Sequence, residues 1–277
     1  NNWRSTTEIL GKPNRRRLRR ARQNYGYYLR KRKQMNYFII TGASKGIGAG
    51  IAKELLAQGN TVMGISRSEN KNLPNLIQHS VDLANLETLE TTFSEILKTV
   101  DFEKATGIFL INNAGLLAPM KPIQKASGNE ITKHINVNVI APMIMSSVFI
   151  RELSALNIRK RILNISSGAG KNPYFGWSAY CTSKAGIDMF SRTVSVEQKE
   201  VKNPVEVISF APGVVDTEMQ SEIRATDEED FINLPRFKEM HEAGVLQDAA
   251  TVGKFIADYL QSDRFEDGGV VDIRDFD

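Results

Sequence analysis

Short apolar runs alternate with longer amphipathic stretches along most of this chain. The run at 38–40 is too short for a helix and rich in β-branched side chains, whereas apolar residues recur at helical spacing from Ile47 to Leu56. Repetition of this alternation indicates a single α/β domain whose sheet is mostly parallel and covered by helices on both faces. The pattern predicts strands at 37–41, 61–66, 77–81, 107–112, 161–167, 205–211 and 270–273, and later helices at about 86–99, 130–153 and 248–261.

Three glycines lie where the first strand turns into the first helix. Their spacing is Gly42-x-x-x-Gly46-x-Gly48, which differs from the commoner Gly-x-Gly-x-x-Gly dinucleotide fingerprint. The first turn of a helix carries unpaired N–H groups and the positive end of the helix dipole, so it can bind a phosphate. A tight turn without a ligand is the alternative for this segment alone.

The second predicted strand ends at Arg67, nineteen residues after Gly48. In dinucleotide-binding folds an acidic residue near this place binds the ribose of NAD, whereas a basic residue accommodates the 2′-phosphate of NADP. Ser66, Ser68 and Lys45 could add donors and positive charge. The pattern therefore favours NADP, unless Arg67 is an ordinary solvated arginine.

Polar residues also follow later strands, at the edge where parallel sheets bind ligands. Asn112–Gly115 and Ser167 lie at two such strand ends, and Asn138 lies inside an apolar helix, where its amide needs a partner. Tyr180 and Lys184 share a helix face at i and i+4 spacing. A nearby ammonium is expected to lower the pKa of a phenol and make it a general acid, although a chance pair at this spacing is the alternative.

Charge is unevenly distributed between two parts of the chain. The 277 residues carry a net charge of +4, but residues 1–34 alone hold 12 Lys or Arg and one acid, so the remainder is mildly acidic. The charge density of residues 1–34 predicts a disordered basic extension. We expect Met35 to be the natural start; a nucleic-acid or membrane arm and an organellar transit segment are the alternatives.

Few residues support other kinds of site. The single cysteine, Cys181, excludes an internal disulfide framework and favours a reducing, cytoplasmic location, and it is expected to be a buried structural thiol. His79, His134 and His241 show no metal-ligand spacing, so no metal is expected. The longest apolar run, 137–150, is interrupted by polar residues and is expected to pack in the core or against another subunit rather than to cross a membrane.

The motifs together resemble the short-chain dehydrogenase/reductase family. They are Thr41-Gly-Ala-Ser-Lys-Gly-Ile-Gly48, Asn112-Asn-Ala-Gly115, Asn138, Ser167, Tyr180-x-x-x-Lys184 and Pro212-Gly213, in the family's order and spacing across residues 36–277. The resemblance implies a Rossmann-like fold, NADPH as cofactor, and a catalytic set of Asn138, Ser167, Tyr180 and Lys184. In that set Tyr180 donates the proton, Ser167 orients the carbonyl, Lys184 binds the nicotinamide ribose, and Asn138 holds a relay water.

The resemblance also implies which residues contact the cofactor and the substrate. Cofactor contacts are expected at Gly42, Ser44, Lys45, Gly46, Ile47, Arg67, Asp82, Asn113, Ala114, Gly115, Tyr180, Lys184, Pro212, Gly213, Val215 and Thr217. Substrate contacts are expected at Ser167, Trp177, Tyr180 and Asp272. Residues 218–243 are polar and contain Pro235, and they are expected to form a mobile lid.

Within the family, the chain is similar to the branch of sepiapterin reductases and bacterial benzil reductases. The expected reaction is NADPH-dependent reduction of one ketone of a 1,2-dicarbonyl such as benzil to an (S)-hydroxyketone, by a homodimer or homotetramer. The alternatives are a pterin-type carbonyl reductase and a non-catalytic dinucleotide-binding regulator. The basic extension adds a third, a nucleic-acid-binding protein.

Overall fold

The computed structural model describes residues 35–276, and the expectations for residues 1–34 lie outside this part of the chain. Its main sheet has seven strands in the order β3-β2-β1-β4-β5-β6-β9, and every neighbouring pair is parallel. The predicted doubly wound α/β fold is therefore confirmed. The strands are β1 (Met35–Thr41), β2 (Thr61–Ser66), β3 (Ile77–Ser80), β4 (Ala105–Asn112), β5 (Arg159–Ile165), β6 (Glu206–Ala211) and β9 (Val270–Asp272).

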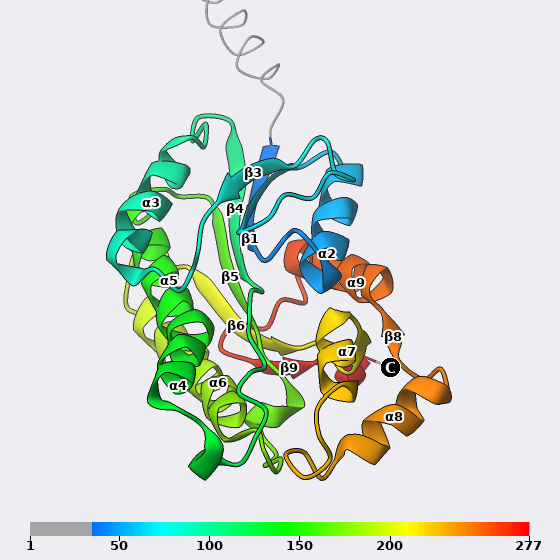
Figure 1. Cartoon of the computed structure of the whole chain (residues 1–277). Coiled ribbons are helices and arrows are strands. Elements are labelled where there is room, and N and C mark those ends of the chain that lie inside the picture. The colour runs from blue at the N-terminus through cyan, green and yellow to red at the C-terminus, as the bar shows by residue number, and fades with distance from the viewer. Residues whose placement is uncertain (1–34, 277) are drawn as a thin grey trace, which may run out of the picture. The chain divides into compact units, whose positions relative to one another are not determined.

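Strand β1 shows why the sheet is covered on both faces. Its residues alternate in direction, so Phe38 and Ile40 enter one core cluster while Tyr37 and Ile39 enter the other. Helices α2 (Gly46–Ala57) and α9 (Ala249–Gln261) close the first cluster; α3 (Leu86–Lys98), α5 (Ala141–Glu152) and α6 (Ser178–Gln198) close the second. Figure 1 shows these helices as layers on opposite sides of the sheet.

The predicted helix at 130–153 is divided into three parts. Helix α4 (Gly128–Ile135) begins with a capping box between Ser127 and Glu130, a π-helical turn follows at Asn136–Ile140, and α5 continues the path. Together they form the 25-residue segment Gly128–Glu152, which is long and apolar enough to cross a membrane, whereas the sequence pattern had indicated only a shorter run. Half of its most apolar window is buried inside the protein, as in the core helix of a globular domain.

Residues 217–246 form an excursion that is more ordered than the predicted polar lid. Short strands β7 (Val215–Asp216) and β8 (Gln247–Asp248) pair at its base, and the segment between them holds α7 (Glu218–Arg224) and α8 (Leu234–Glu242). Phe231, Leu234 and Phe237 are buried in a third apolar cluster with Trp177. The excursion is thus attached to the rest of the fold by an apolar core of its own.

Candidate active site

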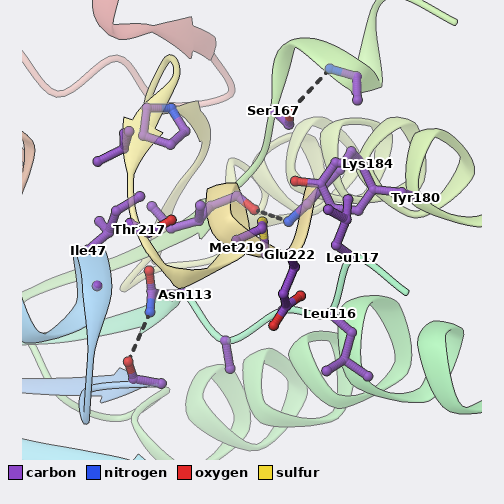
Figure 2. A pocket seen from close by; sticks show the side chains of 18 of the residues that line it. Ile47, Asn113, Leu116, Leu117, Ser167, Tyr180, Lys184, Thr217, Met219 and Glu222 are labelled. Carbon is purple, nitrogen blue, oxygen red and sulfur yellow. Dashed lines mark hydrogen bonds between the residues drawn. The ribbon is translucent and has the colours of Figure 1, made fainter. Parts of the chain in front are cut away.

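A cavity of about 900 Å³ lies at the carboxyl ends of the parallel strands. It is lined by the glycine turn after β1, the segment after β2, Asn113–Leu117 after β4, Ser166 and Ser167 after β5, and Pro212–Thr217 after β6. All sixteen residues expected to contact a cofactor line this cavity, as do the four expected to contact substrate. Asn138 is the one expected catalytic residue that does not. Figure 2 shows Tyr180 and Lys184 side by side, with Ser167 nearby.

Close backbone packing explains the glycine turn. Gly42 has a φ of +69°, and a Cβ on Gly48 would stand 2.3 Å from the Gly42 carbonyl oxygen. The Asn113 amide donates to the carbonyls of Thr41, at 2.9 Å, and Gly42, at 3.3 Å, which ties the two cofactor-side loops together. No side chain caps the N-terminus of α2, so its first N–H groups fit a phosphate of a bound dinucleotide.

Two basic residues at the adenosine end behave differently. Arg67 is exposed, lines the cavity and has no acidic partner among residues 35–276. Lys45 also lines the cavity, but it forms an ion pair with Glu218 of α7. Hydrogen bonds from Ser66 Oγ to the Ser68 carbonyl and from Ser68 Oγ to Ser44 Oγ hold the Arg67 segment beside the glycine turn.

Tyr180 and Ser167 meet on the cavity wall. Tyr180 is 7% exposed, and its hydroxyl is hydrogen-bonded to that of Ser167, whose oxygen also accepts from the Ala169 N–H at 3.2 Å. Burial raises the pKa of Tyr180 to about 12, and the hydrogen bond with Ser167 only partly opposes this. The expectation of a lowered pKa is therefore wrong for the cofactor-free protein, because desolvation by burial is the largest influence on the phenol.

Lys184 lies one helical turn from Tyr180, with its Nζ 5.5 Å from the centre of the tyrosine ring. Its ammonium donates to the Ile165 carbonyl at 2.8 Å. Burial lowers the pKa of Lys184 to about 8, and the negative charge of Asp188 acts in the opposite direction. At neutral pH, therefore, a protonated phenol and a mostly protonated amine stand side by side.

The Asn138 amide is fully engaged by the protein. Its Oδ1 accepts from the Leu116 N–H and its Nδ2 donates to the Leu116 carbonyl, both at 2.8 Å, and Nδ2 also lies 3.0 Å from His134 Nε2. The side chain thus pairs with neighbouring backbone and with His134. The relay water expected at Asn138 stays a prediction.

The far end of the cavity is aromatic. Trp177 stacks on Phe231 with ring centres 4.7 Å apart, contacts Phe237, and meets Tyr180 edge to face. It therefore serves as both core and cavity wall. Asp272 also lines the cavity, but both its carboxylate oxygens accept from the Arg274 side chain, at 2.8 and 2.6 Å.

The sequence pattern described as short chain dehydrogenase matches residues 36–228. The chain belongs to the short-chain dehydrogenases. A member of this family is an oxidoreductase that acts on carbonyl or alcohol groups with a nicotinamide dinucleotide, and the residues expected to bind that cofactor line the cavity described above.

Relatives within the family share most of the chain. A Bacillus cereus protein named benzil reductase ((S)-benzoin forming) is 47% identical over 247 residues, which are 86% of this chain and 99% of that protein. The sepiapterin reductase of Xenopus laevis is 27% identical and covers 86% of this chain and 95% of its own length. The crystal structure of the KRED1-Pglu enzyme superposes with a TM-score of 0.73 at 27% identity, over 84% of this chain and 99% of that one.

Sequence reasoning missed several residues that shape the site. The excursion contributes Met219, Glu222, Ile223 and Arg236 to the cavity wall, and no periodic pattern marks them, because they approach the sheet edge only through the fold. His134, which shows no ligand spacing in the sequence, is fully buried next to Asn138. Within residues 35–276 no group of three or more His, Cys, Asp or Glu could hold a metal ion.

Cys181 follows Tyr180 but does not join the reactive groups. It is half-buried rather than buried, and its Sγ lies 3.7 Å from the Asn172 carbonyl. Burial raises the pKa of the thiol, which disfavours the thiolate needed for nucleophilic attack.

Proposed function

We propose that this protein reduces one ketone of an aromatic 1,2-dicarbonyl, such as benzil, to an (S)-hydroxyketone with NADPH. The observation that carries the proposal is the meeting of the Tyr180 and Ser167 hydroxyls beside Lys184, on the wall of a cavity that also holds the glycine turn. The relationship to a protein named benzil reductase supports this choice of substrate.

NADPH would supply the hydride, and the protein's own side chains supply the rest. Tyr180 is the proton donor, since its raised pKa keeps the phenol protonated at neutral pH. Ser167, already hydrogen-bonded to the same hydroxyl, donates to the substrate oxygen and fixes its position. After the proton has moved to that oxygen, the Lys184 ammonium stabilises the phenolate. Asn138 contributes indirectly, by holding the Leu116 backbone.

The cavity wall supports an uncharged aromatic substrate. Trp177 and Phe237 offer flat aromatic surfaces near Tyr180, and Leu117 adds an aliphatic one. The Asp272 carboxylate, a group suited to binding an amine or a pterin, is instead held by Arg274, and this pairing lowers the pKa of Asp272. A pterin-type carbonyl reductase is the second candidate, because this carboxylate does line the cavity.

Arg67 supports NADPH over NADH. Its guanidinium is unpaired among the described residues and can bind the 2′-phosphate of the adenosine ribose, whereas no carboxylate stands directly after β2 to bind a free ribose. We further propose that the enzyme works in the cytoplasm as a homodimer or homotetramer, without a metal and without binding nucleic acid through its folded domain.

The proposal is tested by initial rates with benzil, sepiapterin and a simple aldehyde, each with NADPH and with NADH, and by chiral chromatography of the benzoin formed. We expect the highest kcat/KM for benzil with NADPH and an excess of the (S)-product. Faster reduction of sepiapterin would favour the second candidate. Binding of NADPH without turnover of any carbonyl would indicate a dinucleotide-binding regulator instead.

A variant separates the cofactor argument from the substrate argument. Arg67→Asp should shift the ratio of kcat/KM values for NADPH and NADH toward NADH, because the new carboxylate repels a 2′-phosphate and accepts from a ribose hydroxyl. Arg192→Asp is the matched control, since Arg192 is exposed on α6 and does not line the cavity. An unchanged ratio in Arg67→Asp would refute the role given to Arg67.

A further inference from the structure

His134 is a buried histidine that the proposed reaction does not use. It lies in the last turn of α4 and has no exposed surface. Its Nδ1 is 2.7 Å from the Ala118 carbonyl oxygen, and a carbonyl can only accept a hydrogen bond, so Nδ1 carries a proton. The protonation state of the other ring nitrogen, Nε2, then depends on its own neighbours.

Those neighbours make Nε2 an acceptor. The Asn138 Nδ2 lies 3.0 Å away, and the two hydrogen bonds with Leu116 determine which end of that amide is the nitrogen. Ser183 Oγ is also 3.0 Å away, but its own proton goes to the Tyr180 carbonyl at 2.8 Å. One Asn138 N–H therefore points at His134 Nε2, an arrangement that fits the neutral tautomer protonated on Nδ1.

We propose that His134 is a positioning residue: as a neutral imidazole it fixes the orientation of the Asn138 amide, and through Leu116 it holds the loop that borders the reactive groups. The loop 113–117 lies against both Asn138 and Lys184. A Cβ built on Gly115 would stand 3.7 Å from Asn138 Oδ1 and 3.8 Å from Lys184 Nζ. A change in the Asn138 amide is thus transmitted to the backbone next to Lys184.

The surroundings oppose a charge on His134. Burial lowers its pKa, the Ala118 carbonyl acts in the opposite direction, and the positive charge of Lys184 lowers it further. The edge of the imidazole also meets the Tyr180 ring, with ring centres 6.1 Å apart. The charged side chains on the elements that pack around His134 are Glu130 and Lys133 on α4, Lys121 on the preceding loop, and Lys184 and Asp188 on α6. Of these, only Lys184 acts appreciably on the pKa of the imidazole.

Protonation at acid pH would reverse this arrangement. A proton on Nε2 would face the N–H of Asn138 and would be accepted by Ser183 Oγ, 3.0 Å away, so His134 would no longer accept from Asn138. The Asn138 amide, and with it the loop 113–117, would then be held less firmly. Activity is therefore expected to fall on the acid side through a single protonation, at a pH below the ordinary range of histidine titration.

Two substitutions separate positioning from simple packing. His134→Gln keeps a donor for the Ala118 carbonyl and an acceptor for Asn138 but cannot titrate. His134→Leu removes both hydrogen bonds and leaves two buried polar groups without partners. His241→Gln is the control for loss of a histidine elsewhere in the protein, because His241 is exposed on α8. For each protein, kcat, KM for benzil and the Kd for NADPH are measured from pH 5 to pH 9.

We expect His134→Gln to have a kcat close to that of the wild type at neutral pH and to lack the acid-side protonation step. His134→Leu should lower kcat by about 10- to 100-fold, because displacements of about 1 Å near reacting groups have effects of this size. His241→Gln should retain the wild-type profile. If His134→Gln keeps the acid-side step of the wild type, or if His134→Leu retains full kcat, the positioning role is refuted. Should His134→Leu fail to fold, the profile of His134→Gln alone decides.

The rate measurements rest on the proposed function, so a second measurement is independent of any substrate. Nitrogen NMR of ring-labelled histidine in the cofactor-free protein should show His134 neutral, with its proton on Nδ1, at neutral pH. A proton on Nε2, or a charged ring at neutral pH, would overturn the inference even if benzil were an excellent substrate. The expected tautomer in a protein that does not reduce benzil would refute only the proposed substrate.

Discussion

Replacing Lys184 by methionine should abolish turnover and also change how the stability of the cofactor-free protein depends on pH. The wild-type ammonium is buried, with 5% of the residue exposed, and has one hydrogen-bond acceptor, the Ile165 carbonyl. Its pKa falls from the ordinary 10.5 to about 8. Since one pKa unit corresponds to about 1.4 kcal/mol, keeping this charge buried at neutral pH costs about 3 kcal/mol.

The sign of the pH effect follows from proton binding. Between pH 8 and 10.5 the unfolded chain keeps the lysine proton while the folded chain has lost it, so the wild type becomes more stable as pH rises through this window. Methionine removes this dependence. At pH 7, Lys184→Met should therefore gain the free energy that burying the charge costs the wild type, but lose about 1–3 kcal/mol because the Ile165 carbonyl is left without its donor. By pH 10 the difference in unfolding free energy between the two proteins should have moved by about 2–3 kcal/mol in favour of the wild type.

Urea unfolding at pH 7 and pH 10 measures both quantities. Lys53→Met, which removes an exposed lysine from α2, controls for the loss of one positive charge. Lys160→Met provides a contrast, because the Lys160 ammonium is buried but donates to three carbonyls, at 2.8 to 3.0 Å, all of which would lose this donor. If the difference in unfolding free energy between Lys184→Met and the wild type is the same at both pH values, the buried charge of Lys184 does not make stability depend on pH, and the reasoning is refuted.

Three further predictions concern the site and its frame. Tyr180→Phe should lower kcat by about 100- to 10,000-fold with little change in the Kd for NADPH, measured by stopped-flow kinetics and cofactor fluorescence, and retained turnover would refute the proton-donor role. Gly48→Ala should weaken NADPH binding and lower the Tm, because its Cβ would stand 2.3 Å from the Gly42 carbonyl oxygen. Gly186→Ala is the control, since Gly186 lies in open space on α6, and it should raise the free energy of unfolding by about 0.5–1 kcal/mol. Equal effects of the two substitutions would contradict the packing argument. Trp177→Ala should lower the free energy of unfolding by about 3–5 kcal/mol and raise KM for benzil, because it empties the cluster between Tyr180 and Phe231; an unchanged KM would mean that the indole does not contact substrate.

The fold could be predicted from the sequence because its signals are local. Alternating side chains in β1 and helical spacing in α2 each fix an element, and a parallel sheet follows from their alternation. Strand boundaries differ by one or two residues, as at β5, predicted at 161–167 and observed at Arg159–Ile165. The positions of the cofactor-binding residues follow in turn, because the carboxyl ends of parallel strands must share one edge.

Interactions between distant residues could not be predicted in this way. Lys45 and Glu218 are 173 positions apart, and nothing near either residue indicates that they pair. The excursion was expected to be polar because its charged residues dominate the composition, yet Phe231 and Phe237 are enough to anchor it against Trp177. Such contacts depend on how the chain returns to the sheet edge, which periodicity does not describe.

The pKa of Tyr180 shows the same limit in electrostatic terms. From spacing alone the ammonium of Lys184 is the dominant influence, because the distance between i and i+4 side chains is known but their burial is not. In the folded protein burial shifts the two pKa values apart, Tyr180 up to about 12 and Lys184 down to about 8, which disfavours phenolate and ammonium alike. A protonated tyrosine is nevertheless the form that a carbonyl reductase needs, so the proton is in place before substrate arrives. The phenolate is required only after proton transfer, and at that stage the remaining charge of Lys184, 5.5 Å from the ring, has a partner of opposite sign.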